Sequence, residues 1–191
     1  MLSPTLSLVL ASKSPRRSQL LEAAGIPFTV RTAEVEEVYP PETPGLEIAP
    51  YLARLKARGS FHLLNEGEIL LAADSVVLIE GEKYGKPKSR EEAVATLLLL
   101  SDSVHTVVTG CCLKDAEREE VFSSVAQVHV NVISPEEAAW YVDTYRPYDK
   151  AGAYGIQEWI GLAKVSRIEG SYPAIMGLPV AMVYERLLSW R

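Results

Sequence analysis

"LASKSPRRSQLLEAAGI", at residues 10–26, decides how this chain begins to fold, because an apolar run passes directly into a helix signal. The apolar residues 5–12 predict a short strand, and Ser14 followed by Pro15 suits the start of a helix. Gly25 predicts the end of that helix. A turn that leads from a strand into a helix presents free backbone N–H groups and the positive end of the helix dipole, which favour an anion such as phosphate.

Three cations, Lys13, Arg16 and Arg17, gather at this turn in a chain that is acidic overall, with 19 basic and 25 acidic residues and a net charge of −6. Arginines in the first turn oppose the helix dipole, so a bound polyanion would explain them. The alternative is that they are solvated and paired with nearby acids. The acidic balance argues against binding to nucleic acid polymers or anionic membranes, since both need a basic surface. The pattern therefore favours a small anionic ligand.

The remaining pattern predicts a mixed α/β protein with adjacent antiparallel strands, and the length of 191 residues fits a single domain over 1–191. Predicted helices cover about 46–59, 90–100 and 135–145, the last capped by Ser134, and a C-terminal helix begins near Pro179. Predicted strands cover 28–39, which runs into an acidic loop, 68–79, which Asp74 interrupts, a hairpin that turns near Ala116–Glu117, and about 162–168. The stretch "EGSYPAIMGLP" is expected to be a loop.

The two cysteines, Cys111 and Cys112, are adjacent in a predicted strand. Their side chains would point to opposite faces, so we expect reduced thiols and a reducing compartment. The N-terminus places its apolar residues before its charges, the reverse of a signal peptide. No uninterrupted apolar run reaches the roughly 18 residues that a membrane helix needs. We therefore expect a cytoplasmic protein.

Asp74 lies within the apolar run "ILLAADSVVLI". Burying a carboxylate is costly unless it is paired, hydrogen-bonded or bound to a metal, so Asp74 is a candidate metal ligand or general base. The alternative is an aspartate that caps the end of a strand. Glu37, in "AEVEEVYP", is a second acidic group for a hard cation such as Mg²⁺, although adjacent glutamates are also common on solvated loops.

Two further loops carry polar candidates. In "GKPKS", Pro87 stiffens the backbone around Lys86, which could neutralise a phosphate, and Lys56 on a predicted helix is a similar but weaker candidate. Either lysine could equally be a solvated surface group. In "DKAGAYGIQ", small residues let the backbone approach a ligand, and Gln157 offers an amide that can pair with a base edge. The sequence contains no paired His and Cys spacing typical of zinc and no P-loop.

Taken in order, "LASKSPRRSQLL", "VEE", "LARLKA", "AADSVV", "GKPKSREEA", "LLLSDSVHTVVTG", "DKAGAYGIQ" and "GSYPAIMGLPV" resemble the Maf family of nucleoside triphosphate pyrophosphatases. The resemblance runs from about residue 9 to 180. It implies an elongated, twisted mixed β-sheet flanked by helices, with two lobes around a cleft, similar to the inosine triphosphate pyrophosphatases. It also implies a homodimer.

The resemblance further points to the branch that acts on dTTP and UTP. Arg16, Gln157 and the complete "DKAGAYGIQ" match that branch, whereas Ser75 stands where it usually has threonine. Glu158 and Trp159 replace a glycine that usually follows the glutamine. The implied reaction, that of a nucleoside triphosphate diphosphatase, hydrolyses the bond between the α and β phosphates and gives the monophosphate and pyrophosphate.

By resemblance, the site residues fall into three groups. The first group has catalytic roles: Asp74 would act as the general base, and Lys56 and Lys86 would neutralise phosphate charge. The second group binds the substrate. Its members at the triphosphate would be Ser12, Ser14 and Arg17, and those at the base would be Arg16, Ser75 and Gln157. Those that would hold Mg²⁺ or Mn²⁺ are Glu37 and Asp74.

Three other functions stay open at this point. The chain could be a Maf pyrophosphatase for 7-methyl-GTP, a non-catalytic nucleotide-binding regulator of cell division, or a plain interaction module. The second would bind triphosphates without turnover, and the third would leave the buried position of Asp74 unexplained.

Overall fold

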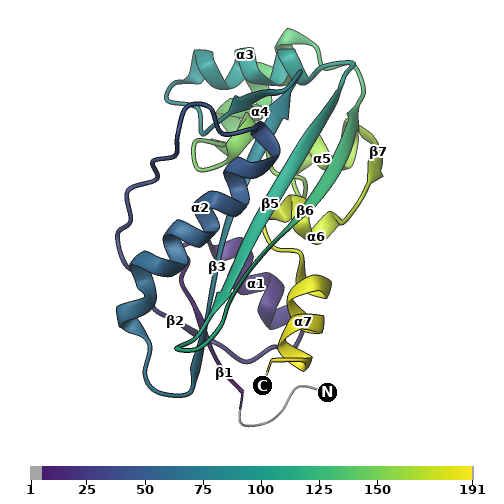
Figure 1. The fold of residues 1–191 in the computed structure, drawn as a ribbon. Helices are drawn as coiled ribbons and strands as arrows, with labels where there is room; N and C mark the ends of the chain where they lie inside the picture. Colours follow the sequence, from purple (N-terminus) through teal and green to yellow (C-terminus); the bar gives the residue numbers. More distant parts are fainter. Residues whose placement is uncertain (1–5, 191) are drawn as a thin grey trace. The chain divides into compact units, whose positions relative to one another are not determined.

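The computed structural model describes residues 6–190, which divide into two compact units (Figure 1). The first contains the described residues up to Asp74, Thr109–Ser124 and those from Gly177 onward, and the second contains Ser75–Val108 and Val125–Met176. Three long strands continue from one unit into the other: β3 (Glu68–Ile79), β5 (Val104–Lys114) and β6 (Glu119–Val130).

Within residues 6–190 the strands form a seven-stranded sheet in the order β2-β1-β3-β5-β6-β7, with β4 also paired to β3. β1 (Ser7–Leu10) pairs in parallel with both β2 (Thr29–Val30) and β3. β4 (Glu82–Tyr84) is antiparallel to β3, and β7 (Val165–Glu169) is antiparallel to β6. The predicted fold class, a mixed β-sheet flanked by helices, is confirmed.

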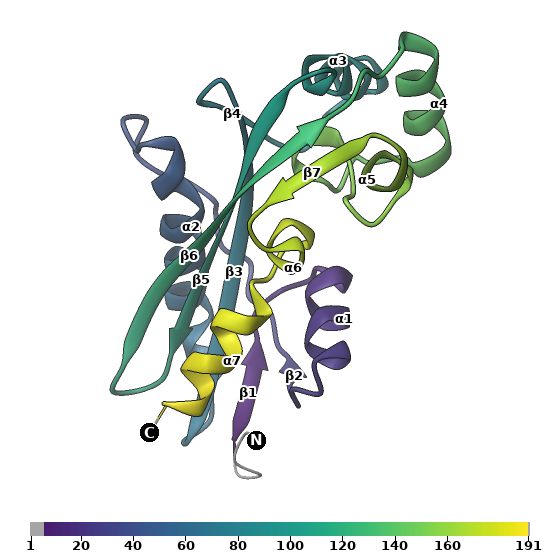
Figure 2. The ribbon, with the colours of Figure 1, turned by 90° about the vertical axis from the view of Figure 1, so that its right-hand side faces the viewer.

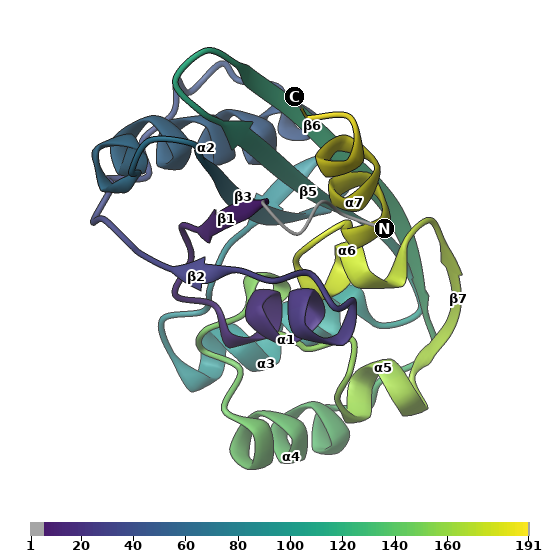
Figure 3. The same ribbon diagram turned by 90° about the horizontal axis from the view of Figure 1, so that it is seen from below.

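In the first unit, helices cover both faces of the sheet (Figure 3). α1 (Pro15–Ala23) and α7 (Val180–Leu188) pack on the face formed by Ile69, Leu71 and other alternate strand residues. α2 (Gly45–Ser60), which is followed by the 3₁₀ turn η1 (Phe61–Leu63), packs on the opposite face, where Leu70 and Ala72 lie. Successive residues of one strand therefore face different helices, as the two-residue period of a strand requires.

The adjacent cysteines follow the same alternation. Cys111 belongs to the cluster beneath α1 and α7, whereas Cys112 belongs to the cluster beneath α2. Both are free and buried, and burial raises the pKa of each thiol to about 12. The prediction of two reduced thiols on opposite faces is confirmed, and neither thiol forms a reactive thiolate at neutral pH.

The second unit has its own core, built where α3 (Arg90–Leu100) and α4 (Pro135–Tyr145) pack together (Figure 2). α4 begins with the predicted Ser134 cap, which forms a capping box with Glu137. This reciprocal pair satisfies two backbone donors that a helix start otherwise leaves unpaired. The shorter elements of this unit are the 3₁₀ turn η2 (Ala151–Ala153), α5 (Trp159–Ala163) and α6 (Tyr172–Met176).

Four local predictions need correction. The strand predicted over 28–39 is limited to β2 at residues 29–30, because its partner β1 ends at Leu10 and offers no further pairing. β3 continues through Asp74 without the predicted interruption. The strand predicted near 162–168 begins only at Val165, after the helix α5, and the loop predicted at "EGSYPAIMGLP" contains the helix α6.

The start of the first helix is as predicted in position but not in its capping contact. Ser14 occupies the N-cap and Pro15 the first turn, but the Ser14 side chain makes no capping hydrogen bond. Within residues 6–190, no helix is long and apolar enough to cross a membrane.

Two carboxylates of the first unit make its stability depend on pH. Bidentate hydrogen bonds from Arg31 (2.6 Å each), and a further one from the Asn65 N–H, lower the pKa of Glu68 from 4.5 to about 2. Hydrogen bonds from Arg58, and then from Arg54, lower that of Glu119 to about 2. A group whose pKa is lower in the folded state stabilises fully above its unfolded pKa, and this contribution is lost as the pH falls through its folded pKa.

We therefore expect the free energy of unfolding to fall as the pH drops from about 4.5 to about 2. Urea titrations at pH 5, 4, 3 and 2 will measure this slope. Glu68→Gln should be less stable than the wild type at pH 7 and should lose less stability on acidification. Equal slopes for variant and wild type would contradict the assignment of this dependence to the Arg31–Glu68 pair.

Candidate functional site

Asp74 and Lys56 meet in the first unit, on the sheet face that α2 covers. Leu70, Ala72 and Asp74 alternate along β3 and so share this face. Lys56, from α2, forms an ion pair and a hydrogen bond with Asp74. The Asp74 side chain is buried, and the ammonium partner offsets the cost of removing the carboxylate from water. Because Asp74 lies inside β3, it is not the cap of a strand end.

Glu37 brings a second carboxylate to the same lysine. The Lys56 Nζ atom lies 2.8 Å from Glu37 Oε1, and the Glu37 side chain is 52% exposed, against 11% for Asp74. Glu37 belongs to the irregular segment between β2 and α2, where the sequence predicts an acidic loop. One ammonium group therefore contacts a buried carboxylate and a more exposed one.

Arg17 ties the start of α1 to the segment before α7. Its Nε donates to the Gly177 carbonyl oxygen at 2.9 Å, and its Nη1 donates to Ser12 Oγ at 3.1 Å. Ser12 Oγ also accepts a hydrogen bond of 3.2 Å from the Ser14 N–H. Gly177 has φ +127°, a backbone conformation that favours glycine, so this carbonyl is presented by a turn that other residues would strain. The predicted residues Ser12, Ser14 and Arg17 thus form one connected group.

The charges of this group and of the carboxylates act on each other. The pKa of Arg17 lies below its usual value because the side chain is buried. The negative charges of Asp74 and, to a smaller extent, Glu37 oppose this lowering but do not cancel it. Arginine nevertheless remains protonated at every physiological pH. Arg17 therefore adds a second fixed positive charge close to Asp74, alongside Lys56.

The other two cations of the opening turn differ in their surroundings. Lys13 pairs with Glu34 at 3.2 Å, and the two side chains are 70% and 94% exposed. Lys13 is therefore a solvated cation paired with a nearby acid. This alternative was raised for Arg16 and Arg17, and Arg17 instead donates hydrogen bonds to Gly177 and Ser12. Arg16 is partly buried in the first turn of α1, one residue before Arg17.

The two carboxylates have the donor chemistry of a site for the expected divalent metal. Glu37 and Asp74 supply hard oxygen donors, and both lie within reach of a single positive centre, since Lys56 contacts both. Among residues 6–190 no cluster of three or more His, Cys, Asp or Glu residues could hold a metal ion. Mg²⁺ is commonly bound by one or two carboxylates, with water and substrate phosphates as its other ligands, so the pair fits such an ion.

The second unit contains the other three predicted residues. Ser75 follows Asp74 in β3 and is partly buried, whereas Lys86 is exposed beside the buried Pro87. Gln157 is partly buried, and its Oε1 atom is buried without a hydrogen-bond partner. An acceptor in that state suits a ligand that donates a hydrogen bond.

A comparison with protein families assigns the chain. The model described as Maf-like protein matches residues 7–190, almost the whole sequence. The chain belongs to the Maf family. The resemblance predicted from eight sequence motifs is therefore confirmed.

Curated Maf relatives are similar over nearly their full length. A protein from Bacteroides thetaiotaomicron named dTTP/UTP pyrophosphatase is 45% identical over 181 residues, which is 94% of each chain. One of the same name from Flavobacterium johnsoniae is 43% identical over 94% of this chain and 93% of its own. Among solved structures, the Ham1 protein of Staphylococcus aureus has a TM-score of 0.48 at 20% identity, covering 65% of this chain and 71% of that one.

Some contacts of this Maf protein were not predicted from the sequence. No local pattern indicates that Arg17 contacts Gly177, because 160 residues separate them. A polar cluster of Tyr141, Lys150 and Glu158 in the second unit was also missed. Its sequence signals were Lys150, which lies in the matching stretch "DKAGAYGIQ", and Glu158, which departs from the glycine usual in the resembling Maf branch.

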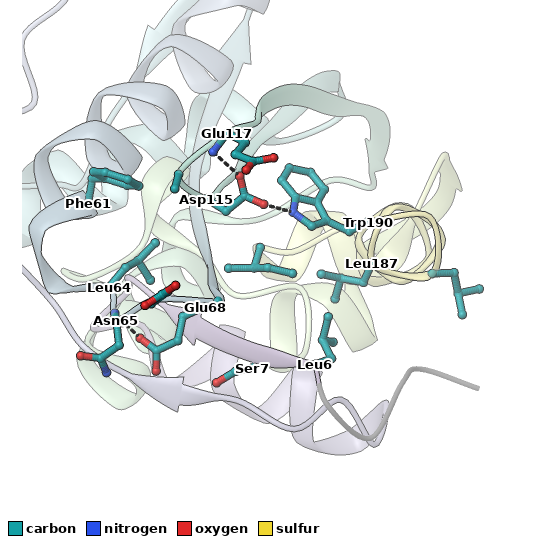
Figure 4. A pocket seen from close by; sticks show the side chains of 15 residues that line it. Leu6, Ser7, Phe61, Leu64, Asn65, Glu68, Asp115, Glu117, Leu187 and Trp190 are labelled. Carbon is teal, nitrogen blue, oxygen red and sulfur yellow. Dashed lines mark hydrogen bonds between the residues drawn. The ribbon is translucent and has the colours of Figure 1, made fainter.

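The first unit also contains a pocket of about 1060 Å³ that is separate from the predicted residues (Figure 4). Leu64, Leu187 and Trp190 form part of its apolar lining, and Asp115 accepts a 2.6 Å hydrogen bond from the Trp190 ring nitrogen. The charged side chains among its described lining residues are all acidic: Glu66, Glu68, Asp115 and Glu117. A lining of that charge does not suit a triphosphate, so this pocket is not the candidate nucleotide site of the Maf protein.

Proposed function

We propose that this chain hydrolyses dTTP and UTP to the nucleoside monophosphate and pyrophosphate. The observation that carries the proposal is the position of Asp74: a buried carboxylate paired with Lys56, near Arg17, and sharing its lysine with Glu37. The names of the relatives at 42–45% identity support the same substrates.

Asp74 is the proposed general base. It accepts a proton from water while the water oxygen bonds to one of the two phosphorus atoms of the α–β anhydride. The bond from that phosphorus to the bridging oxygen breaks, the bridging oxygen stays with the other phosphorus, and the products are the monophosphate and pyrophosphate. Lys56 and Arg17 stabilise the negative charge of the phosphates, and Ser12 and Ser14 lie at the turn that precedes α1. Fixed positive charges of this kind supply most of the catalysis in phosphoryl transfer. Lys86 is proposed to contact phosphate as well.

Glu37 and Asp74 are proposed to hold Mg²⁺ or Mn²⁺. The metal, when bound, would neutralise phosphate charge and lower the pKa of its water. Lys56 contacts both carboxylates, so it keeps them near each other and limits their repulsion.

Arg16, Ser75 and Gln157 are proposed to read the base. The Gln157 Oε1 atom is a buried acceptor without a partner, and the N3–H of thymine and uracil is a donor. Cytosine lacks a hydrogen at N3. This chemistry supports a preference for dTTP and UTP.

The proposal is tested by measuring pyrophosphate release from dTTP, UTP, CTP, dGTP and 7-methyl-GTP, with Mg²⁺ or Mn²⁺. We expect the highest kcat/KM for dTTP and UTP, and no turnover in the presence of a chelator. Activity mainly on 7-methyl-GTP would contradict the assignment of Arg16, Ser75 and Gln157 as the residues that contact the base, but it would still support the proposed reaction. Binding of triphosphates without any turnover would instead favour a nucleotide-binding regulator.

A further inference from the structure

A buried polar cluster in the second unit fixes the segment that carries Gln157. The Tyr141 hydroxyl donates a hydrogen bond to Glu158 and accepts one of 3.0 Å from the Gly155 N–H. Lys150 Nζ lies 3.2 Å from the other oxygen of Glu158. Tyr141 is fully buried, and the side chains of Lys150 and Glu158 are 10% and 18% exposed.

The Glu158 carboxylate also explains why residue 155 is a glycine. A Cβ atom at Gly155 would lie 2.8 Å from the Glu158 carboxyl carbon and 3.0–3.1 Å from its oxygens. The carboxylate is held in this place by Tyr141 and Lys150 on its other sides, so it has little room to withdraw. Burial, and then the hydrogen bond to Glu158, raises the pKa of Tyr141, which therefore stays a neutral donor.

The same segment is anchored again a few residues earlier. The Gly152 N–H donates to the Gly85 carbonyl oxygen at 3.2 Å, and the Tyr154 hydroxyl lies 2.8 Å from His105 Nε2. Burial lowers the pKa of His105 to about 4, so the ring is neutral at pH 7. These contacts fix the backbone ahead of Gln157, and Glu158 fixes it immediately afterwards.

We infer that Glu158, with Tyr141 and Lys150, is a positioning unit that orients Gln157 toward the nucleotide base and thereby sets substrate specificity. The inference rests on the proposed function, in which Gln157 reads the base. The Gln157 Oε1 atom has no hydrogen-bond partner of its own, and the anchored residues on either side fix the backbone from which this side chain extends. Glu158 is a positioning residue and does not touch the substrate.

The test compares UTP with N3-methyl-UTP, which lacks the N3–H donor. For the wild type we expect kcat/KM to be about tenfold higher for UTP, the value of one well-formed hydrogen bond. In Glu158→Gln, which keeps the shape and loses the ion pair with Lys150, this ratio should fall toward one. The loss should appear mainly in KM for UTP, with N3-methyl-UTP almost unchanged.

Two further measurements separate this role from a loss of folding. Tyr141→Phe removes one hydroxyl and should reduce the same ratio, and amide exchange of the peptide containing Gly155 should be faster in both variants. Glu169→Gln is the matched control, because Glu169 pairs with His129 between β6 and β7 and makes no contact with the cluster. Its ratio, exchange rate and Tm should stay close to those of the wild type.

The possible results of these experiments would overturn different parts of the inference. An unchanged UTP preference in both variants, in an enzyme that turns over UTP normally, would overturn the positioning role alone. A wild type that turns over neither nucleotide would overturn the proposed function and this inference with it. A wild type that turns over both at equal kcat/KM would overturn the base contact assigned to Gln157, and with it this inference, but not the hydrolysis of UTP. Unchanged amide exchange at Gly155 would show that the cluster does not hold the segment.

Discussion

Asp74→Asn should lower kcat for pyrophosphate release from dTTP by about 10²–10⁴-fold, the usual contribution of a general base. Asparagine keeps the shape of Asp74 and can still accept a hydrogen bond from Lys56, but it cannot take a proton from water. Glu37 still pairs with Lys56 in the variant, so the fold should persist. Steady-state pyrophosphate release and a thermal melt on the same preparation will measure both effects.

Asp143→Asn is the matched control for this experiment. Asp143 is exposed and pairs with Arg90 at 2.6 Å on the surface of the second unit. It should retain wild-type kcat and KM. If Asp74→Asn also retained kcat within a few-fold, Asp74 would not be the base, whatever its effect on metal affinity.

Gly110→Ala should cause a large loss of stability. Gly110 lies in β5 directly against α2, and a Cβ atom there would be 2.2 Å from the Pro50 nitrogen and 2.4 Å from the Ala49 carbonyl carbon. These are backbone atoms of a helix, so they cannot move aside without displacing α2. Overpacking of this kind costs about 1–3 kcal/mol or more, which corresponds to a Tm lower by about 2–12 °C.

The same substitution should also reduce activity, because α2 carries Lys56 to Asp74. Gly85→Ala is the control for stability: a Cβ atom there would have no neighbour within 4 Å, and the Tm should hardly change. Thermal unfolding followed by circular dichroism will compare the two variants. Equal melting temperatures for both would mean that α2 and β5 do not approach as closely as described.

Much of the local structure could be predicted from the sequence, because its signals act between near neighbours. The helix start at Ser134 depends on residues within one turn, and Ser134 caps that helix as predicted. The opposite facing of Cys111 and Cys112 follows from strand geometry alone. Where a partner strand decides the outcome, as for the end of β2 at Val30, local propensity was not enough.

The family and most of the helices and strands could be predicted from the sequence alone, because motifs and periodicity are properties of the chain, whereas the short helices α5 and α6 were not expected. Which of the candidate residues contact each other depends on the tertiary structure. Lys56 reaches Asp74 because α2 covers one face of β3, and Arg17 reaches the Gly177 carbonyl across 160 residues of sequence. Contacts between distant segments depend on how faces pack, and a buried charge such as Asp74 acquires its partner only when that packing is complete.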